Sequence, residues 1–217
     1  MALRGSANGA RESVVLVHGL WLGGWSLALL ARRLARCGFD TYPYSFPTCR
    51  LDLRENAARL HAFAARVPGD VVHFVGHSLG GVVIRATLHG VDLNRPGRVV
   101  TLGSPHGGSA AAVQVGRTAF GRRWLGRSIG ALLAGEARGL RPVRREIGVI
   151  AGSVPLGLGR LFVRHDEVND GVVTVTEAGL AEASDSIVLP TSHSGMLVSR
   201  AVATQVCVFL RTGRFRH

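Results

Sequence analysis

Short apolar runs alternate along the chain with longer segments whose apolar residues recur at helical spacing. The runs predict strands at residues 13–17, 39–45, 71–75, 98–103, 146–152 and 185–189. The amphipathic segments predict helices at residues 25–35, 51–67, 78–88 and 196–210. A continuous apolar run is typical of a strand buried on both faces, as in a parallel sheet. Strands alternating with helices therefore predict an α/β fold: a mostly parallel, doubly wound sheet with helices on both faces.

The alternation stops between residues 110 and 145. Two Arg-rich stretches of small residues, around 111–120 and 124–134, have helical character there. We expect this segment to be a small helical lid inserted into a single domain that spans residues 1–217; the alternative is one long crossover helix. A lid would bring several large apolar side chains to a bound apolar group. These are Phe120, Trp124, Leu125, Leu132 and Leu133.

Composition and charge indicate a globular domain and bear on which partners it could bind. Of the 217 residues, 47% are hydrophobic and 18% are charged, which is typical of a globular domain. The net charge is +12, but all 26 basic residues are arginines, scattered and without interleaved aromatic residues, so we expect no specific nucleic-acid binding. The charge is compatible with weak association with anionic membrane surfaces.

The sequence also indicates where the protein is located and the state of its cysteines. No apolar run approaches the roughly 20 residues that span a bilayer, and residues 1–12 lack the apolar core of a signal peptide. We therefore expect a cytoplasmic protein. Cys37, Cys49 and Cys207 have no metal-like spacing, and we expect them to be reduced and mostly buried.

A Gly-His-Ser-Leu-Gly motif links the predicted strand at 71–75 to the helix that follows. A serine at the apex of so tight a turn has unfavourable backbone dihedrals, and its hydroxyl projects clear of the sheet. Gly76 and Gly80 flank Ser78 because a β-carbon at either position would clash where strand and helix pass close together. The motif in this context predicts a nucleophile elbow, with Ser78 at its apex.

A serine hydroxyl needs a base within hydrogen-bond reach, and that base needs an orienting carboxylate. His193 follows the last predicted strand and is the candidate base. Asp170 is the candidate acid, because the Asn-Asp-Gly sequence around it permits a sharp turn. Asp166 and Glu167 are the alternatives for the acid. Parallel topology brings the three loops to one end of the sheet.

The same end of the sheet carries candidates for binding the reacting group. An oxyanion needs backbone N–H donors, for which Leu79, next to the serine, and Leu20, after the first strand, are the candidates. Further candidates for substrate contact lie just after predicted strands or in the expected lid. They are Trp21, His106, Phe120 and Trp124. For His106 the alternative is a hydrogen bond within its own glycine-rich turn.

Five stretches together resemble the signature stretches of α/β-hydrolase lipases and esterases, with the compact bacterial lipase group the most similar. They are residues 18–20, 76–80, 103–109, 169–171 and 190–193. The resemblance covers nearly the whole chain. It implies an α/β-hydrolase fold without large caps, and hydrolysis of small-molecule or lipid carboxylic esters through an acyl-enzyme.

Residue by residue, the resemblance implies Ser78 as nucleophile, Asp170 as acid, His193 as base, and Leu20 and Leu79 as oxyanion donors. Secreted lipases of that group carry a calcium site with an acidic residue close after the catalytic histidine. Here Ser-Gly-Met follows the histidine instead, so we expect no calcium, no other metal and no cofactor.

Two other functions fit the same motifs. An acyltransferase would share the acyl-enzyme and replace water by an alcohol or amine. A non-catalytic relative that binds lipid or protein would have no physical need for a complete set of serine, histidine and acid. Epoxide and haloalkane hydrolysis are disfavoured, because on this fold they need an aspartate at the elbow.

Overall fold

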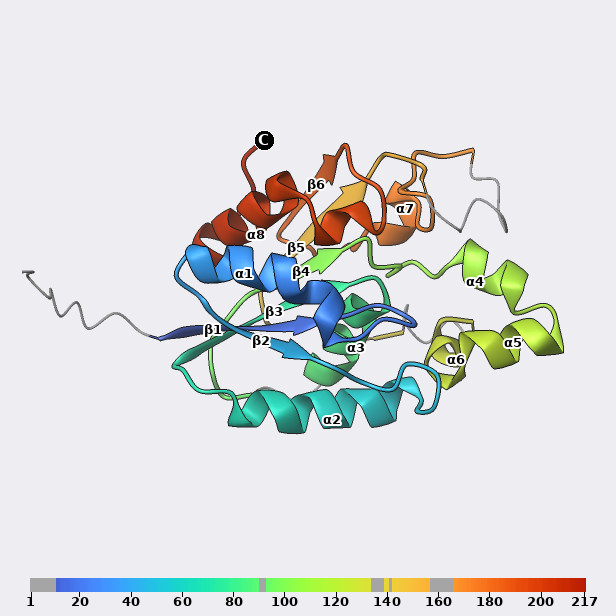
Figure 1. The fold of residues 1–217 in the computed structure, drawn as a ribbon, viewed down its shortest axis with the longest axis horizontal. Helices are drawn as coiled ribbons and strands as arrows, with labels where there is room; N and C mark the ends of the chain where they lie inside the picture. Colours follow the sequence, from blue (N-terminus) through green and yellow to red (C-terminus); the bar gives the residue numbers. More distant parts are fainter. Residues whose placement is uncertain (1–10, 90–92, 134–138, 141, 157–165) are drawn as a thin grey trace, which may run out of the picture.

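The computed structural model describes residues 11–89, 93–133, 139–140, 142–156 and 166–217, and in this part of the chain six strands form one sheet. The strands are β1 (Glu12–Val17), β2 (Asp40–Tyr44), β3 (Val71–His77), β4 (Val99–Leu102), β5 (Ile147–Gly152) and β6 (Asp185–Leu189). Their order is β2-β1-β3-β4-β5-β6, and every pair of neighbours is parallel (Figure 1). The predicted parallel α/β fold is confirmed.

Helices cover both faces of this sheet, which explains why its strands are apolar throughout. Successive residues of β1 alternate between two cores: Val14 and Leu16 contribute to one, Val15 and Val17 to the other. The first core is closed by α1 (Ala28–Arg36) and α8 (Arg200–Thr212), and the second by α2 (Leu53–Arg66) and α3 (Leu79–Leu88) (Figure 1).

Local chemistry fixes where these helices begin and end. A capping box between Asp52 and Glu55 starts α2, and Gly213, at φ 77°, ends α8. The last helix begins later than the apolar pattern predicts, because a 3₁₀ turn, η3 (Gly195–Leu197), comes first and Ser199 then caps α8. A second 3₁₀ turn, η1 (Gly24–Leu27), likewise precedes α1.

The expected lid segment lies beyond the carboxyl ends of the strands (Figure 1). Its described part forms three short helices, α4 (Ala110–Val115), α5 (Ala119–Leu125) and α6 (Arg127–Leu133), where the sequence predicts two longer ones. Gly116 ends α4, and Gly126, at φ 78°, separates α5 from α6. A β-carbon on Gly126 would lie 2.4 Å from the Cα atom of Cys49, so the chain turns there only with glycine.

The expectation of three reduced cysteines is wrong. Cys37, at the end of α1, forms a disulfide with Cys207 in α8, across 170 residues of sequence. The two helices lie side by side on the same face of the sheet, which brings the cysteines together. Cys49 is a free, half-buried thiol. Disulfides of this kind persist in oxidising compartments.

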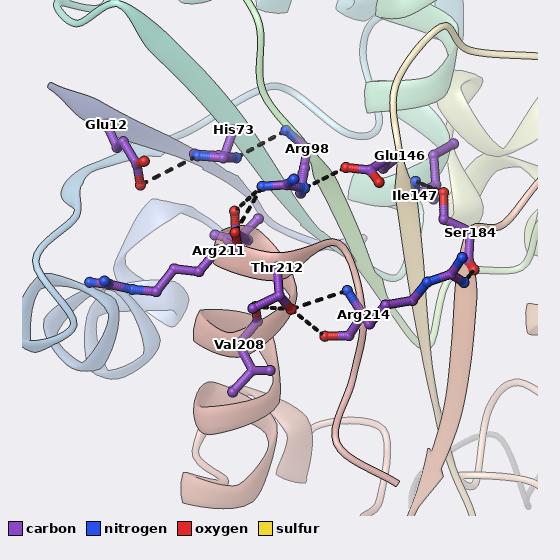
Figure 2. A network of polar contacts seen from close by, with 11 residues as sticks. Glu12, His73, Arg98, Glu146, Ile147, Ser184, Val208, Arg211, Thr212 and Arg214 are labelled. Carbon is purple, nitrogen blue, oxygen red and sulfur yellow. Dashed lines mark hydrogen bonds and ion pairs between the residues drawn. The ribbon is translucent and has the colours of Figure 1, made fainter. Parts of the chain in front are cut away.

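At the amino end of the sheet, Arg98 joins three elements (Figure 2). Its guanidinium pairs with Glu146, before β5, and donates to the carbonyl oxygens of Leu210 and Arg211 in α8. The backbone N–H of Arg98 donates to Nδ1 of His73 at 2.9 Å. Burial and the neighbouring arginine charges lower the pKa of His73 to about 4, so this imidazole is neutral. These bonds hold the end of the sheet opposite the lid segment.

Among the described residues, no helix has the length and apolar character needed to cross a bilayer.

Candidate active site

Ser78 sits between β3 and α3 with φ 54° and ψ −125°, a conformation that residues other than glycine rarely adopt. The glycines beside it allow the tight turn. A β-carbon on Gly76 would lie 2.5 Å from the backbone nitrogen of Gly81, and one on Gly80 would lie 2.3 Å from the carbonyl oxygen of Val17. The chain therefore holds Ser78 in the strained geometry that the motif predicts for an elbow.

His193 and Asp170 form a buried, hydrogen-bonded pair beside this turn. The Nδ1–H of His193 donates to Oδ2 of Asp170 at 2.7 Å, and Asp170 is only 1% exposed. The other carboxylate oxygen, Oδ1, accepts the backbone N–H groups of Val172 and Val173 at 2.9 and 2.8 Å. The backbone N–H of His193 donates to the Asp170 carbonyl oxygen at 2.8 Å. With Nδ1 donating, Nε2 of His193 is left as a proton acceptor.

The alternatives for the acid lie elsewhere on the same loop. Asp166 and Glu167 are exposed, and among the three acidic candidates the structure brings only Asp170 into contact with His193. The Asn-Asp-Gly turn is responsible: Oδ1 of Asn169 accepts the Gly171 N–H at 2.9 Å, and Gly171 has φ 98°.

Two strand-end glycines make room for the pair, and sequence reasoning missed both. Gly103 follows β4 at φ 52°, and a β-carbon there would lie 2.7 Å from Oδ2 of Asp170 and 3.1 Å from Nδ1 of His193. Gly152 ends β5, and a β-carbon there would lie 2.8 Å from Cβ of Asp170. Each glycine directly follows or ends an apolar run, and this position at a strand end is the signal that could have identified them.

Two buried histidines, His18 and His77, make hydrogen bonds to the loops next to Ser78 and His193. His18, after β1, donates from Nδ1 to the Gly19 carbonyl oxygen at 2.8 Å, while its Nε2 accepts the Phe46 N–H at 3.1 Å. His77 donates from Nε2 to the His193 carbonyl oxygen at 3.0 Å. Burial lowers the pKa of His18, and burial with the neighbouring His193 lowers the pKa of His77 to about 3. Both imidazoles are therefore neutral positioning groups.

Ser78 and His193 open into a cavity of about 310 Å³ between the strand ends and helices α4 to α6. Most of its lining is apolar. The lining residues are Gly19, Leu20, Trp21, Leu22, His77, Ser78, Leu79, Pro105, Ser109, Ala111, Ala112, Val115, Trp124, Leu125, Ile129, Val172, Val173, His193 and Ser194. No hydrogen bond joins the Ser78 hydroxyl to His193 in the described structure, and such bonds are often loose before substrate binds.

The expected lid contacts divide into two groups. Trp21 and Trp124 line the cavity and contact each other, with ring centroids 4.0 Å apart. Phe120 is 80% exposed and lies outside the lining, so the structure corrects its expected place at the substrate. The side chains of Leu132 and Leu133 lie outside the described part of the chain.

His106 also lies away from the cavity, which corrects its expected contact with substrate. It is 3% exposed; its Nε2–H donates to Oγ1 of Thr101 at 3.1 Å, and Nδ1 accepts from the Arg85 guanidinium at 3.4 Å. Burial and the charge of Arg85 lower its pKa to about 3. This neutral imidazole ties the turn after β4 to that strand and to α3.

The residues described contain no group of three or more His, Cys, Asp or Glu side chains arranged to hold a metal ion.

A parallel, doubly wound sheet with a serine on a strained strand-to-helix turn is the architecture of the α/β hydrolases. The chain belongs to the alpha/beta hydrolase family, whose family model matches residues 14–204. A comparison with curated protein sequences gave no match.

Solved structures with this fold include several esterases and lipases. The structure is similar to the Bacillus licheniformis lipase BlEst2 in mature form, with a TM-score of 0.75 and 21% identity, covering 94% of this chain and 92% of that one. It is also similar to the metagenomic carboxyl esterase MGS0156, with a TM-score of 0.66 and 20% identity over 85% of this chain and 65% of that chain. A monoacylglycerol lipase from Paleococcus ferrophilus gives a TM-score of 0.65 and 12% identity over 93% and 94% of the two chains. At these identities the likeness establishes the fold.

Proposed function

We propose that this chain is a serine hydrolase that cleaves carboxylic esters through an acyl-enzyme. The observation that carries the proposal is that a serine in a strained turn and an aspartate-bound histidine line one apolar cavity. Membership of the alpha/beta hydrolase family supports it, and so do similar structures that are named as lipases and esterases.

In the proposed reaction, Nε2 of His193 takes the proton of the Ser78 hydroxyl as Oγ attacks the ester carbonyl carbon. Asp170 holds the imidazole in the required tautomer and stabilises the imidazolium that forms. His193 then gives the proton to the leaving alcohol oxygen, which leaves an ester between Ser78 and the acyl group. His193 next deprotonates a water molecule, whose oxygen attacks the acyl carbon. The acid departs and Ser78 regains its proton.

The oxyanion of each tetrahedral intermediate needs two donors. Leu79 is the first residue of α3, so no carbonyl within the helix accepts its N–H. The N–H of Leu20 has no acceptor among the described residues, and both leucines line the cavity with Ser78. We assign these two N–H groups as the oxyanion donors, each of which typically contributes roughly 10²–10³ in kcat.

The cavity indicates the class of acyl group. Apart from His77 and His193, its lining contains no ionisable side chain, so an uncharged, apolar acyl chain fits it. The cavity volume of about 310 Å³ equals that of roughly ten water molecules, at about 30 Å³ each. We further propose that residues 110–145 form a lid within a single domain, because α4, α5 and α6 all contribute to the cavity wall.

The test compares two serines of the same cavity. A fluorophosphonate probe should label wild-type protein at Ser78, and Ser78→Ala should lose both labelling and turnover of p-nitrophenyl esters while remaining folded. Ser194→Ala is the matched control, because Ser194 lines the cavity but is exposed beside the histidine, and it should keep both. Undiminished turnover by Ser78→Ala would overturn the proposal.

A further inference from the structure

We propose that helix α5 positions the oxyanion donor of Leu20 through a contact between Trp21 and Trp124. This inference rests on the proposed function, because it concerns a donor for the reaction at Ser78. It assigns Trp21 and Trp124 as positioning residues, which act on the reacting group through the backbone of Leu20.

Trp21 directly follows Leu20 and has φ 57°. A bulky side chain is rarely found in this left-handed conformation, so surrounding contacts must hold it there. The peptide plane that carries the Leu20 N–H is joined to the plane between Leu20 and Trp21 only through the dihedrals of Leu20. Contacts that fix Trp21 therefore also restrict the direction of the Leu20 N–H. On the inner side, the Trp21 N–H donates to Oγ1 of Thr48 at 3.3 Å.

On the outer side, the indole of Trp21 is held by α5. Its Nε1–H donates to the backbone carbonyl oxygen of Trp124 at 3.1 Å. The centroids of the two indole rings are 4.0 Å apart at an interplanar angle of 37°, so the rings are in contact. Trp124 is in the last turn of α5, so this hydrogen bond joins the end of that helix to the loop after β1.

The helices on either side of α5 are fixed to the body of the protein. The Ala110 N–H, at the start of α4, donates to Glu177, and the Ser128 hydroxyl in α6 donates to the Leu51 carbonyl oxygen at 2.7 Å. Asn56 of α2 donates to the same hydroxyl at 2.8 Å. The place of α5, and with it that of Trp124, is thereby set from both ends. The contact with Trp21 transmits this position to the loop after β1.

The test uses the acetate ester, whose acyl group is small, so that the size of the cavity does not limit binding. Trp124→Ala and Trp21→Ala should each lower kcat on p-nitrophenyl acetate by roughly 10- to 100-fold, a part of the effect of losing a donor, with KM nearly unchanged. The double variant should be no slower than Trp21→Ala, because Trp21→Ala removes both the ring contact and the hydrogen bond to the Trp124 backbone carbonyl, whereas Trp124→Ala removes only the ring contact. Trp124→Phe, which keeps an aromatic ring against Trp21, should restore most of kcat.

Phe120→Ala is the control in the same helix, because Phe120 is exposed and outside the cavity lining, and it should keep wild-type kcat. Fluorophosphonate labelling of wild-type protein at Ser78 separates the two proposals. Absence of that label contradicts the proposed function. A labelled wild-type protein whose Trp124→Ala variant keeps full kcat on the acetate ester, with only a raised KM for long esters, overturns the positioning role and leaves Trp124 as a cavity wall.

Discussion

Replacement of Asp170 by asparagine tests the proposed histidine tautomer at the level of single atoms. Two backbone N–H groups, from Val172 and Val173, donate to Oδ1 of the carboxylate, and the His193 Nδ1–H donates to Oδ2. An asparagine at this position must place its carbonyl oxygen toward the two backbone donors. The opposite orientation would lose both hydrogen bonds and bring the amide NH₂ against two N–H groups.

In the favoured orientation the asparagine NH₂ faces Nδ1 of His193. Because the NH₂ group only donates, Nδ1 becomes an acceptor and the imidazole proton moves to Nε2. That tautomer has no lone pair to accept the Ser78 proton. An aspartate-to-asparagine change of this kind lowers kcat by about 10⁴-fold, which corresponds to a barrier raised by about 5 kcal/mol.

We expect Asp170→Asn to stay folded and to lose about 10⁴ in kcat on a p-nitrophenyl ester. The matched control is Asp166→Asn, an exposed change on the same loop, which should keep kcat within about twofold. Urea unfolding of both variants checks that the loss is not one of folding. A kcat within tenfold of wild type for Asp170→Asn, or an equal loss for Asp166→Asn, would refute the assignment.

Three further predictions follow from contacts described above. Gly103→Ala should lower kcat by roughly 10- to 100-fold without unfolding the protein, because its β-carbon would lie 2.7 Å from the carboxylate; unchanged kcat would show that the pair can shift without loss. The pKa values of His77 and His106 are about 3, below the unfolded value of 6.5, so the unfolded chain binds more protons below pH 6.5. The free energy of unfolding should therefore fall on acidification by up to about 2.7 kcal/mol per pH unit for the two, and pH-independent urea midpoints would contradict this. Cys207→Ser should lower the free energy of unfolding by roughly 2–5 kcal/mol relative to oxidised wild type, measured by urea denaturation; equal midpoints would count against the disulfide.

The fold could be predicted from the sequence because each strand is buried on both faces. Continuous apolar runs therefore marked the strands closely, and the last strand was predicted at residues 185–189, as observed. Helix ends were less accurate where 3₁₀ turns intervene, as before α8. The expected lid contains three short helices and not the two predicted, because Gly116 ends α4 and Gly126 separates α5 from α6.

The candidate site residues could be predicted from the sequence because their conformations depend on residues close to them in the chain. The conformation of Ser78 depends on glycines two residues away on either side, and that of Asp170 on its neighbours Asn169 and Gly171. Contacts between distant segments could not be predicted in the same way. Cys37 and Cys207 meet only because α1 packs beside α8. The contact of Trp21 with Trp124 likewise depends on how α5 is placed over the sheet.

Much of the cavity lining comes from one stretch, residues 109–129, whereas the rest comes from the segments that follow β1, β3, β4, β5 and β6. Exchange of that stretch for one of different shape would change the accepted acyl group, provided that the new stretch keeps Trp124 and its contact with Trp21. The stretch thus has two roles: its apolar side chains select the acyl group, and its one tryptophan holds the loop that carries Leu20. The ends for such an exchange are Ser109, whose side chain caps α4, and Ser128, whose hydroxyl donates to the Leu51 carbonyl oxygen at 2.7 Å.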